Sequence, residues 1–446
     1  MKIKTFSIGG VHPDDAKISS EAPIEILPLP QTAYISMAQH LGAPATPAVQ
    51  KGDTVKVGQK IADASGFVSA PIHSPFSGTV TAVEPRADLA GNMVPHIVIA
   101  VEGDEWMPEI DRSPEIRREI NATPEEIVAR IKEAGIVGLG GAAFPTSIKL
   151  CPPPGKKAEC LILNGTECEP YLTSDDRIMR EQTEEILIGA VIMMKALGVT
   201  KGYVGIEENK QEAIRAMKEK AAAYPQIEIV TLKKKYPQGG EKQLIDAVTG
   251  RKVPSLGLPI DAGAVVQNVG TSLAVYEAVQ KNKPLIDNVV TVTGHCIPQP
   301  KNFRVRVGST YSQLLEAVGG APENAAKFIS GGPMMGKAIV NLDAATQKAT
   351  SSLLVLTEEE TLRGKATNCI RCGKCAGACP MGLEPFLLFK LAKAGGRYDE
   401  LEQEKIFDCI ECGCCLYSCP ANIPLLDLIR PAKAEVTRIM KSRPKK

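Results

Sequence analysis

The middle of the chain alternates between short apolar runs and longer segments with helical periodicity. Apolar runs at residues 161–163, 203–206 and 227–232 predict strands, while residues 181–197 and 209–223 predict helices between them. Strands and helices that alternate in this way predict a parallel sheet with right-handed crossovers. We therefore expect an α/β domain in this region.

A helix is predicted just before this α/β unit. Thr123 fits an N-cap, Pro124 would occupy the first helical position, and Glu126 completes a capping box. Gly135 is placed to end the helix. The polar residues 104–123 in front of it are typical of a linker.

Two β-rich segments flank the α/β unit. Residues 49–84 consist of short β runs separated by glycine and proline turns, and their spacing resembles the lipoyl and biotinyl carrier family, the barrel-sandwich hybrid. The expected hairpin tip, residues 64–67, has no lysine, so a structural or docking role is favoured over carrier function. Residues 288–340 predict a compact α+β module whose helix is capped by Thr310 and Gln313.

Length and composition exclude several classes of protein. At roughly 150 residues per domain, 446 residues predict about three or four domains. The 52 basic and 51 acidic residues leave a net charge of +1, which gives no electrostatic footprint for nucleic acid. No secretion signal is expected at the start, and the longest strongly apolar stretch, residues 186–194, is shorter than the roughly 20 residues that span a bilayer.

Thirteen cysteines in a chain with no expected export signal indicate metal binding rather than disulfides. Eight of them form the motif C-x2-C-x2-C-x3-C-P twice, 40 residues apart: Cys369, Cys372, Cys375 and Cys379, then Cys409, Cys412, Cys415 and Cys419. This spacing is typical of paired [4Fe–4S] clusters, in which the fourth cysteine serves the other cluster. The predicted ligand sets are Cys369, Cys372, Cys375 with Cys419, and Cys409, Cys412, Cys415 with Cys379. Zinc is the weaker alternative, because it usually takes paired C-x2-C units.

The remaining cysteines lack ligand spacing. Cys414 lies outside the 40-residue repeat and is predicted to be a packed thiol, like the core or surface cysteines Cys151, Cys160, Cys168 and Cys296. A helical pattern at residues 385–394 separates the two runs and favours an all-α dicluster domain. The basic segment 429–446 is predicted to be a solvated tail, with contact to an anionic membrane or partner as the alternative.

Iron–sulfur clusters carry single electrons, so a hydride donor would require a converting cofactor. Residues 138–145 form a glycine-rich segment with Lys149 beyond it, a composition that suits phosphate. Its partial match to G-x-G-x-x-A is weak alone, because a helix precedes it. Glu167 and Glu169 follow a predicted strand, where ligands bind in open α/β sheets, although a solvated loop explains them equally well.

The order of these motifs resembles the flavin- and NADH-binding subunits of complex I. Residues 6–17, FSIGGVHPDDAK, together with the carrier-like module, are similar to the C subunits of the Rnf family of ferredoxin:NAD oxidoreductases. The resemblance implies an N-terminal segment with a barrel-sandwich hybrid at 1–105, a Rossmann-like FMN/NADH domain at 120–282, a β-grasp SLBB-like domain at 285–345 and a helical 2×[4Fe–4S] domain at 355–446.

The resemblance also implies which residues bind the flavin and the dinucleotide. They are Gly138, Gly140, Gly141 and Lys149 for the FMN phosphate, Asn164 and Thr166 near the flavin, Glu167 and Glu169 along the flavin and nicotinamide pocket, Phe144 stacked on the dinucleotide, Tyr236, Gly239 and Glu241 in a second segment, and Gln267, Asn268 and Thr271 in a third. No side chain is implied as an acid or base.

The implied activity is hydride exchange between NAD(H) and FMN, followed by single-electron transfer through two [4Fe–4S] clusters. The resemblance places the chain peripherally on the cytoplasmic face of the cell membrane, with partner subunits that translocate ions and an iron–sulfur subunit that meets ferredoxin. Two alternatives stay open: a soluble NADH-dependent reductase of the cobalamin-reductase type, and a non-enzymatic docking scaffold with structural clusters.

Overall fold

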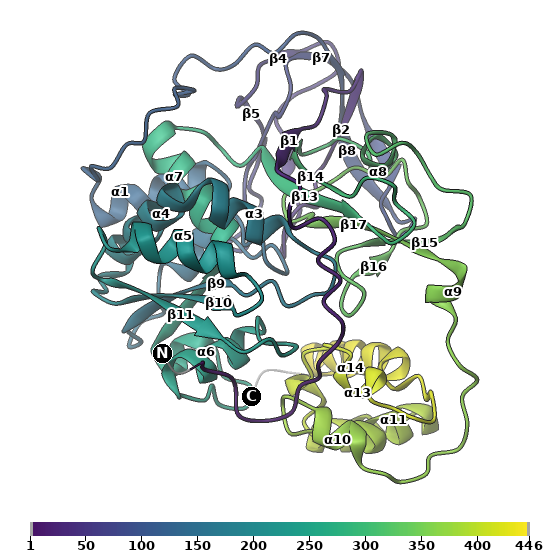
Figure 1. The fold of residues 1–446 in the computed structure, drawn as a ribbon. Coiled ribbons are helices and arrows are strands. Elements are labelled where there is room, and N and C mark those ends of the chain that lie inside the picture. Colours follow the sequence, from purple (N-terminus) through teal and green to yellow (C-terminus); the bar gives the residue numbers. More distant parts are fainter. Residues whose placement is uncertain (1–2, 444–446) are drawn as a thin grey trace.

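Four β-sheets organise residues 3–443, the part of the chain that the computed structural model describes (Figure 1). Two small sheets form a β module, a parallel sheet forms the centre of an α/β domain, and a mixed six-stranded sheet forms a third module. A group of helices follows at the C-terminal end. This order of a β module, an α/β domain, a β-grasp-like module and a helical domain is the predicted fold class.

The N-terminal β module has one sheet in the order β2-β8-β7-β4 and another in the order β3-β5-β6. Its strands are β2 (Thr32–Ser36), β3 (Thr46–Pro47), β4 (Thr54–Val55), β5 (Lys60–Asp63), β6 (Ile72–His73), β7 (Gly78–Ala87) and β8 (Met93–Val101). Ile35, Phe76 and Ile97 are buried between the sheets, so each sheet covers the apolar face of the other. At the hairpin tip, Phe67 is 86% exposed.

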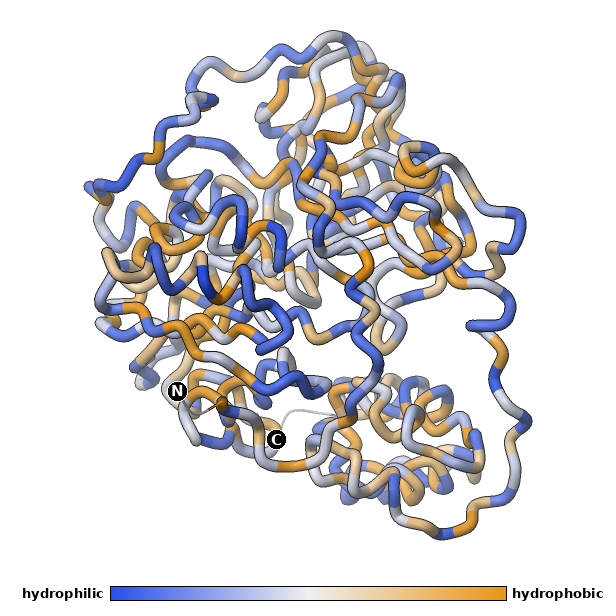
Figure 2. Tube along the Cα trace, in the orientation of Figure 1, coloured by the Kyte–Doolittle hydropathy of each residue, from blue (hydrophilic) through white to orange (hydrophobic). Residues whose placement is uncertain are grey.

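The α/β domain contains a parallel sheet in the order β11-β10-β9-β12, with β9 (Cys160–Gly165), β10 (Gly202–Glu207), β11 (Ile227–Leu232) and β12 (Ala264–Asn268). Its helices are α3 (Ser174–Glu181), α4 (Thr183–Leu197), α5 (Gln211–Ala221), α6 (Glu241–Thr249) and α7 (Val269–Lys281), with a 3₁₀ turn η1 (Pro259–Ala262). Figure 2 shows apolar residues along the strands and hydrophilic residues on the outer turns of the covering helices. The predicted parallel sheet is confirmed.

Helix α1 (Pro124–Glu133) has the predicted capping box. The amide of Glu126 donates to the Thr123 hydroxyl at 3.3 Å, and the Thr123 amide donates to the Glu126 carboxylate at 2.8 Å. The chain turns at Gly135, which has a φ of 64°. A glycine-rich loop then leads to the short helix α2 (Thr146–Lys149).

The six-stranded sheet has the order β1-β14-β13-β17-β15-β16. Its elements are β1 (Ile24–Ile26), β13 (Asp287–Thr293), β14 (Lys301–Arg306), α8 (Tyr311–Glu316), β15 (Ala325–Ser330), β16 (Lys337–Ala338) and β17 (Ser352–Thr357). The predicted capping box of Thr310 and Gln313 is present at α8. Strand β1 comes from the N-terminal segment and pairs in parallel with β14, which the sequence did not indicate.

The C-terminal module is helical, as predicted. It contains α10 (Lys374–Ala378), α11 (Pro385–Ala394), α12 (Tyr398–Gln403), η2 (Ile406–Asp408), α13 (Cys414–Tyr417) and α14 (Leu425–Ser442), preceded by α9 (Glu358–Thr361). The predicted solvated tail is instead a packed helix as far as residue 442: α14 buries Ile429 and Val436 against the module, while basic side chains such as Arg438 stay exposed. Ile429 and Val436 lie seven positions apart, on one face of the helix. Residues 444–446 of the predicted tail lie outside the described part of the chain.

The N-terminal segment, residues 4–26, lies along other modules rather than the β module that follows it. Lys4 pairs with Leu232, and Val11 pairs with Tyr236 beyond the end of β11. In Figure 1 this purple segment descends from β1 and passes between the α/β domain and the C-terminal helices. Within residues 3–443, no helix combines the length and apolar character needed to cross a membrane.

Lys348 joins three of these modules from a fully buried position. Its ammonium group donates to the carbonyl oxygens of Pro71, at 2.9 Å, and Gly135, at 2.8 Å, while its amide donates to the Gln39 side chain. Burial lowers the pKa of Lys348 from 10.5 to about 7. Burial lowers the pKa of nearby His73 to about 3, and the positive charge of Lys348 contributes to this shift.

We expect Lys348 to make stability rise with pH between about 7 and 10.5. Within this window the unfolded chain binds more protons at residue 348 than the folded chain does, so the free energy of unfolding increases with pH. The Lys348→Met variant should flatten this rise in thermal unfolding recorded from pH 7 to 10. Lys218→Met, at an exposed position of α5, should retain the slope. Equal slopes in both variants would contradict this role of Lys348.

Candidate functional site

The order of the parallel sheet creates a switch point between β9 and β12. The chain first builds outward from β9 through β10 to β11, then returns to the other side of β9 with β12. Ligands of open α/β sheets bind beyond the carboxyl ends of strands at such a point. Asn164 near the end of β9 and Asn268 at the end of β12 are register partners there.

The glycine-rich loop forms one wall of this switch point. It closes as a small hairpin in which the Gly138 amide donates to the Phe144 carbonyl at 2.9 Å. The Leu139 amide donates to the Thr271 hydroxyl at 2.9 Å and thereby ties the loop to the start of α7. A Cβ atom on Gly140 would lie 2.9 Å from the Asn268 side chain, so only glycine fits there without displacement.

A second wall comes from the segments after β9 and β11. The Asn164 amide donates to the Gly239 carbonyl at 2.9 Å, and the Thr166 hydroxyl donates to Asn164 at 2.7 Å. Lys149 pairs with Glu241 at 2.8 Å and also donates to the Val266 carbonyl. The structure thus brings together segments separated by about a hundred residues in the sequence, as the resemblance implied.

The chemistry of these walls fits FMN. Gly140 and Gly141 are exposed and leave their backbone amides open to a phosphate, and the second wall contributes the cation of Lys149. Gln267 is only 3% exposed, and its Nε2 atom has no hydrogen-bond partner within residues 3–443. A buried amide donor without a partner is a group that a bound ligand can satisfy. Phe144 is half-buried in the same loop.

Glu167 occupies the start of α3 rather than an open pocket wall. Its carboxylate accepts hydrogen bonds from the amides of Asp175, at 2.7 Å, and Asp176, at 3.3 Å. A negative charge at a helix N-terminus is stabilised by these otherwise unpaired amides. Glu167 therefore fixes the direction in which the chain leaves the switch point.

Glu169 reaches across to the six-stranded module. Its carboxylate accepts from the amides of Met334, at 3.1 Å, and Met335, at 2.8 Å. Burial raises the pKa of Glu169 to about 7, although these two amides oppose the shift. The side chain that sequence assigned to the nicotinamide pocket thus joins two modules.

Lys17 clamps the loop that carries both glutamates. Its ammonium group donates to the carbonyls of Glu167 and Glu169, both at 2.8 Å, and of Leu172 at 2.6 Å. Burial lowers the pKa of Lys17 to about 8, with the charge of Lys210 contributing. Sequence reasoning assigned Lys17 no role, because its partners are backbone carbonyls about 150 residues away.

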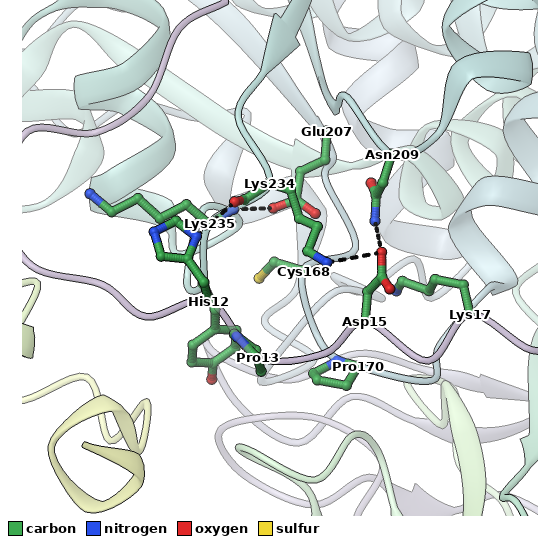
Figure 3. Close-up of a pocket in the computed structure, with 11 residues that line it drawn as sticks. His12, Pro13, Asp15, Lys17, Cys168, Pro170, Glu207, Asn209, Lys234 and Lys235 are labelled. Carbon is green, nitrogen blue, oxygen red and sulfur yellow. Dashed lines mark hydrogen bonds and ion pairs between the residues drawn. The ribbon is translucent and has the colours of Figure 1, made fainter. Parts of the chain in front are cut away.

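A polar pocket lies where the N-terminal segment crosses the ends of β10 and β11 (Figure 3). It is lined by His12, Pro13, Asp15, Lys17, Cys168, Pro170, Glu207, Asn209, Lys234, Lys235 and Tyr236. Asp15 accepts from Asn209 at 3.1 Å and pairs with Lys234 at 3.3 Å. The charges in this pocket therefore largely satisfy one another.

The second predicted ligand set surrounds a pocket in the helical module. Cys379, Cys409, Cys412 and Cys415 all line it, together with apolar residues such as Leu388 and Ile429. Within residues 3–443, no three His, Cys, Asp or Glu side chains converge on a position for a single metal ion. Four thiols around an apolar pocket are a donor set that suits a cluster.

The first predicted ligand set is more open. Cys375 and Cys419 pack against the same apolar cluster of the helical module, and burial raises the pKa of Cys375. Cys369 and Cys372 are exposed. Cys379 and Cys412 line one pocket. Both pairs combine cysteines from different runs, and the crossover of the fourth ligand stays a prediction.

Tyr236 lies between the α/β domain and the pocket of cysteines. Its hydroxyl donates to the Cys412 carbonyl at 2.9 Å, and its own carbonyl accepts from the buried Cys414 thiol at 3.8 Å. The resemblance assigned Tyr236 to a flavin-site segment, whereas its hydroxyl contacts the helical module. Cys414 is packed at this interface, as predicted.

The N-terminal glycines complete the interface with the helical module. Gly10 donates from its amide to the Ala378 carbonyl at 2.9 Å. Gly9 has a φ of 66°, and a Cβ atom there would collide with the Cys379 carbonyl and lie 2.7 Å from the Pro380 nitrogen. Gln243 of α6 donates to the Pro380 carbonyl at 3.2 Å. The chain around Cys379 is thus held from two sides.

Four known domain families match the chain in sequence order. They are the RnfC barrel sandwich hybrid domain at residues 4–104, the Nuo51 FMN-binding domain at 131–277, the SLBB domain at 289–338 and the 4Fe-4S dicluster domain at 365–423. These matches agree with the modules that the structure shows.

Curated relatives extend over most of the chain. It is 48% identical over 404 residues to the C subunit of the proton-translocating ferredoxin:NAD(+) oxidoreductase complex of Clostridium ljungdahlii, covering 90% of this chain and 87% of the relative. It is 43% identical over 437 residues to the Na(+)-translocating counterpart of Acetobacterium woodii, covering 98% of each. Among solved structures, an NAD+-reducing [NiFe]-hydrogenase chain is similar at a TM-score of 0.49 and 17% identity, covering 72% of this chain and 68% of that chain.

The two adjacent cysteines, Cys414 and Cys415, are expected to respond differently to substitution. Cys415→Ala removes a predicted ligand and should reduce iron from about eight atoms per chain to about four or fewer. Cys414→Ala should retain about eight, because its thiol bonds to the Tyr236 carbonyl. Iron and sulfide analysis of both anaerobically purified variants measures this difference. Loss of iron in Cys414→Ala but not in Cys415→Ala would contradict the ligand assignment.

We expect Gly9→Ala to loosen the helical module without removing its clusters. The added Cβ collides with the backbone of Cys379 and Pro380, in addition to the strain of about 1 kcal/mol from a positive φ. Hydrogen exchange of residues 374–380 should therefore increase.

Gly103→Ala is the matched control, because Gly103 has a φ of 65° and no atom lies within 4 Å of the position that an added methyl group would take. Unchanged exchange in Gly9→Ala would contradict the proposed contact.

Proposed function

The chain belongs to the family of C subunits of ion-translocating ferredoxin:NAD(+) oxidoreductase complexes, and we propose that it exchanges electrons between NAD(H) and the iron–sulfur partners of such a complex. It is an oxidoreductase subunit with an FMN-binding domain and a 4Fe-4S dicluster domain. Its cofactors are therefore FMN and [4Fe–4S] clusters, and NAD(H) is its substrate.

The observation that carries this proposal is the position of the helical module. The pocket lined by Cys379, Cys409, Cys412 and Cys415 lies directly against the α/β domain, with the Tyr236 hydroxyl on the Cys412 carbonyl. Gly239, three residues after Tyr236, accepts a hydrogen bond from Asn164 in the second wall of the flavin site. The segment that begins at Tyr236 therefore also borders that wall. A flavin site and a cluster site on either side of one short segment suit direct electron transfer.

Bound FMN supplies the conversion between a hydride and two single electrons. The protein binds and orients it. Gly140 and Gly141 leave room for a phosphate, Lys149 provides a cation, and Thr271 holds the loop at the start of α7. Glu167 and Lys17 fix the loop after β9, and Gln267 offers a buried donor.

We propose the following roles for the predicted site residues. Gly138, Gly140, Gly141 and Lys149 hold the FMN phosphate, and Asn164, Thr166, Gly239, Glu241, Gln267, Asn268 and Thr271 shape the flavin site. Phe144 contacts the dinucleotide. Glu167, Glu169 and Tyr236 support the site through their contacts with α3, the six-stranded module and the helical module.

The domain division proposed from sequence places the four units at 1–105, 120–282, 285–345 and 355–446. The contacts of residues 4–26 support a change to it, in which these residues form a separate strap across the other units. Strand β17, which pairs with β13 and β15, extends the third unit to residue 357.

The family places this subunit within a multi-subunit complex. We propose that the chain binds peripherally at the cytoplasmic face of the membrane and that ion translocation resides in its partner subunits. An iron–sulfur partner subunit would link it to ferredoxin. The relatives named for proton and Na(+) translocation support either coupling ion.

The flavin assignment is tested by titrating anaerobically purified protein with NADH. We expect the flavin absorbance to bleach and reduced-cluster signals to follow in electron paramagnetic resonance. Gly140→Ala should lower the bound flavin, since its methyl group would crowd Asn268, while the iron content stays at about eight atoms per chain.

Gly66→Ala is the control for this titration, because the nearest atom to its added methyl is at 3.5 Å. Wild-type protein that binds no flavin, or a flavin that NADH leaves oxidised, would contradict the proposed function.

A further inference from the structure

The two cluster sites have opposite surroundings. Cys379 and Cys412 are buried at the contact with the N-terminal segment and Tyr236. Cys369 and Cys372, from the other ligand set, are exposed to solvent. One site therefore lies on the inner side of the helical module, facing the flavin domain, and the other opens outward.

The exposed ligands belong to a segment that nothing covers within the described chain. Every residue from 362 to 374 is exposed, and we call this stretch the outer segment. In Figure 1 it leaves α9, runs along the outside of the helical module and enters α10. Its amide at Thr367 donates to the Ala421 carbonyl, so the segment is anchored on the module.

The outer segment is positively charged. It contains Arg363, Lys365, Arg371 and Lys374 and no aspartate or glutamate. Arg363 pairs with Asp427 of α14 at 2.6 Å. Within residues 3–443, the other three cations form no ion pair with a carboxylate, so their charge faces solvent.

The same segment also exposes two apolar side chains. Ile370, between Cys369 and Cys372, is 68% exposed, and Leu362 is 72% exposed. Ile370 therefore stands exposed between two cluster ligands, with the cations Lys365, Arg371 and Lys374 close to it in the chain. The lysine and arginine charges select an acidic partner.

We propose that the outer segment is the docking surface for an acidic iron–sulfur protein that exchanges single electrons with the cluster of Cys369, Cys372, Cys375 and Cys419. The proposal rests on the function proposed above. In each encounter one electron passes from the reduced cluster of the partner, which is oxidised, to the outer cluster, which is reduced. Two such electrons and one proton from solvent convert one NAD+ to NADH.

The test uses the full chain with its cofactors, and a small acidic two-cluster ferredoxin is the probe that stands in for the iron–sulfur partner subunit. Lys365→Glu with Lys374→Glu reverses two charges of the outer segment. We expect the dissociation constant for oxidised ferredoxin at ~20 mM salt to increase at least ~5-fold, and the difference to disappear at ~0.5 M salt. Lys365→Glu alone, four residues before the first ligand, should show a smaller increase in the same direction.

The matched control is Lys218→Glu with Lys220→Glu on exposed positions of α5, which changes the net charge equally. Iron content and flavin bleaching by NADH should be unchanged in all variants. Equal weakening by both double variants, or no weakening at low salt, would overturn the docking surface. The docking surface would also be overturned if the outer-segment variants lost binding to phosphatidylglycerol vesicles but bound ferredoxin normally. The segment would then bind a membrane rather than a protein.

Binding and bleaching separate this proposal from the one on which it rests. Salt-dependent ferredoxin binding that the outer-segment variants weaken supports the surface even if NADH fails to bleach the flavin, which would refute only the proposed function. Normal bleaching with unaltered ferredoxin binding in these variants refutes only the surface.

Discussion

Docking of the helical module against the α/β domain is the constraint on which the rest of the structure depends. Electron transfer between two cofactors slows steeply with distance, so their host domains need a fixed separation. The helical module offers a backbone carbonyl to each of three donors: Cys412 accepts from the Tyr236 hydroxyl, Ala378 from the Gly10 backbone amide and Pro380 from the Gln243 side-chain amide. A backbone carbonyl has no rotamer, so these acceptors are fixed by the path of the chain in the helical module.

Buried lysines hold the other modules in register in a similar way. Lys17 donates to three carbonyls of the loop after β9, and Lys348 donates to carbonyls of the β module and of the turn after α1. Removing an ammonium group from water is unfavourable, and the lowered pKa values of both residues record this. Their hydrogen bonds offset part of that penalty and fix loops that would otherwise be free.

Much of this architecture is local enough to be predicted from sequence. The capping boxes of Thr123 and Thr310, the strands of the parallel sheet and the spacing of the cysteine runs each depend on residues close together in the chain. Pairing of β1 with β14 and the clamp by Lys17 join residues far apart and involve backbone partners, which carry no sequence signal. The partners of Glu167 and Glu169 were missed for the same reason.

Glu169 shows why a site residue need not resemble an open pocket wall. Its pKa of about 7 exceeds the ordinary value of 4.5, so the folded chain binds a proton there more tightly than the unfolded chain does. Glu169 therefore favours folding at pH values below 4.5, and this contribution is lost as the pH rises to about 7. Stability at neutral pH does not explain a carboxylate in this position. Its two bonds to the amides of Met334 and Met335 do, because they align the six-stranded module with the loop that borders the switch point.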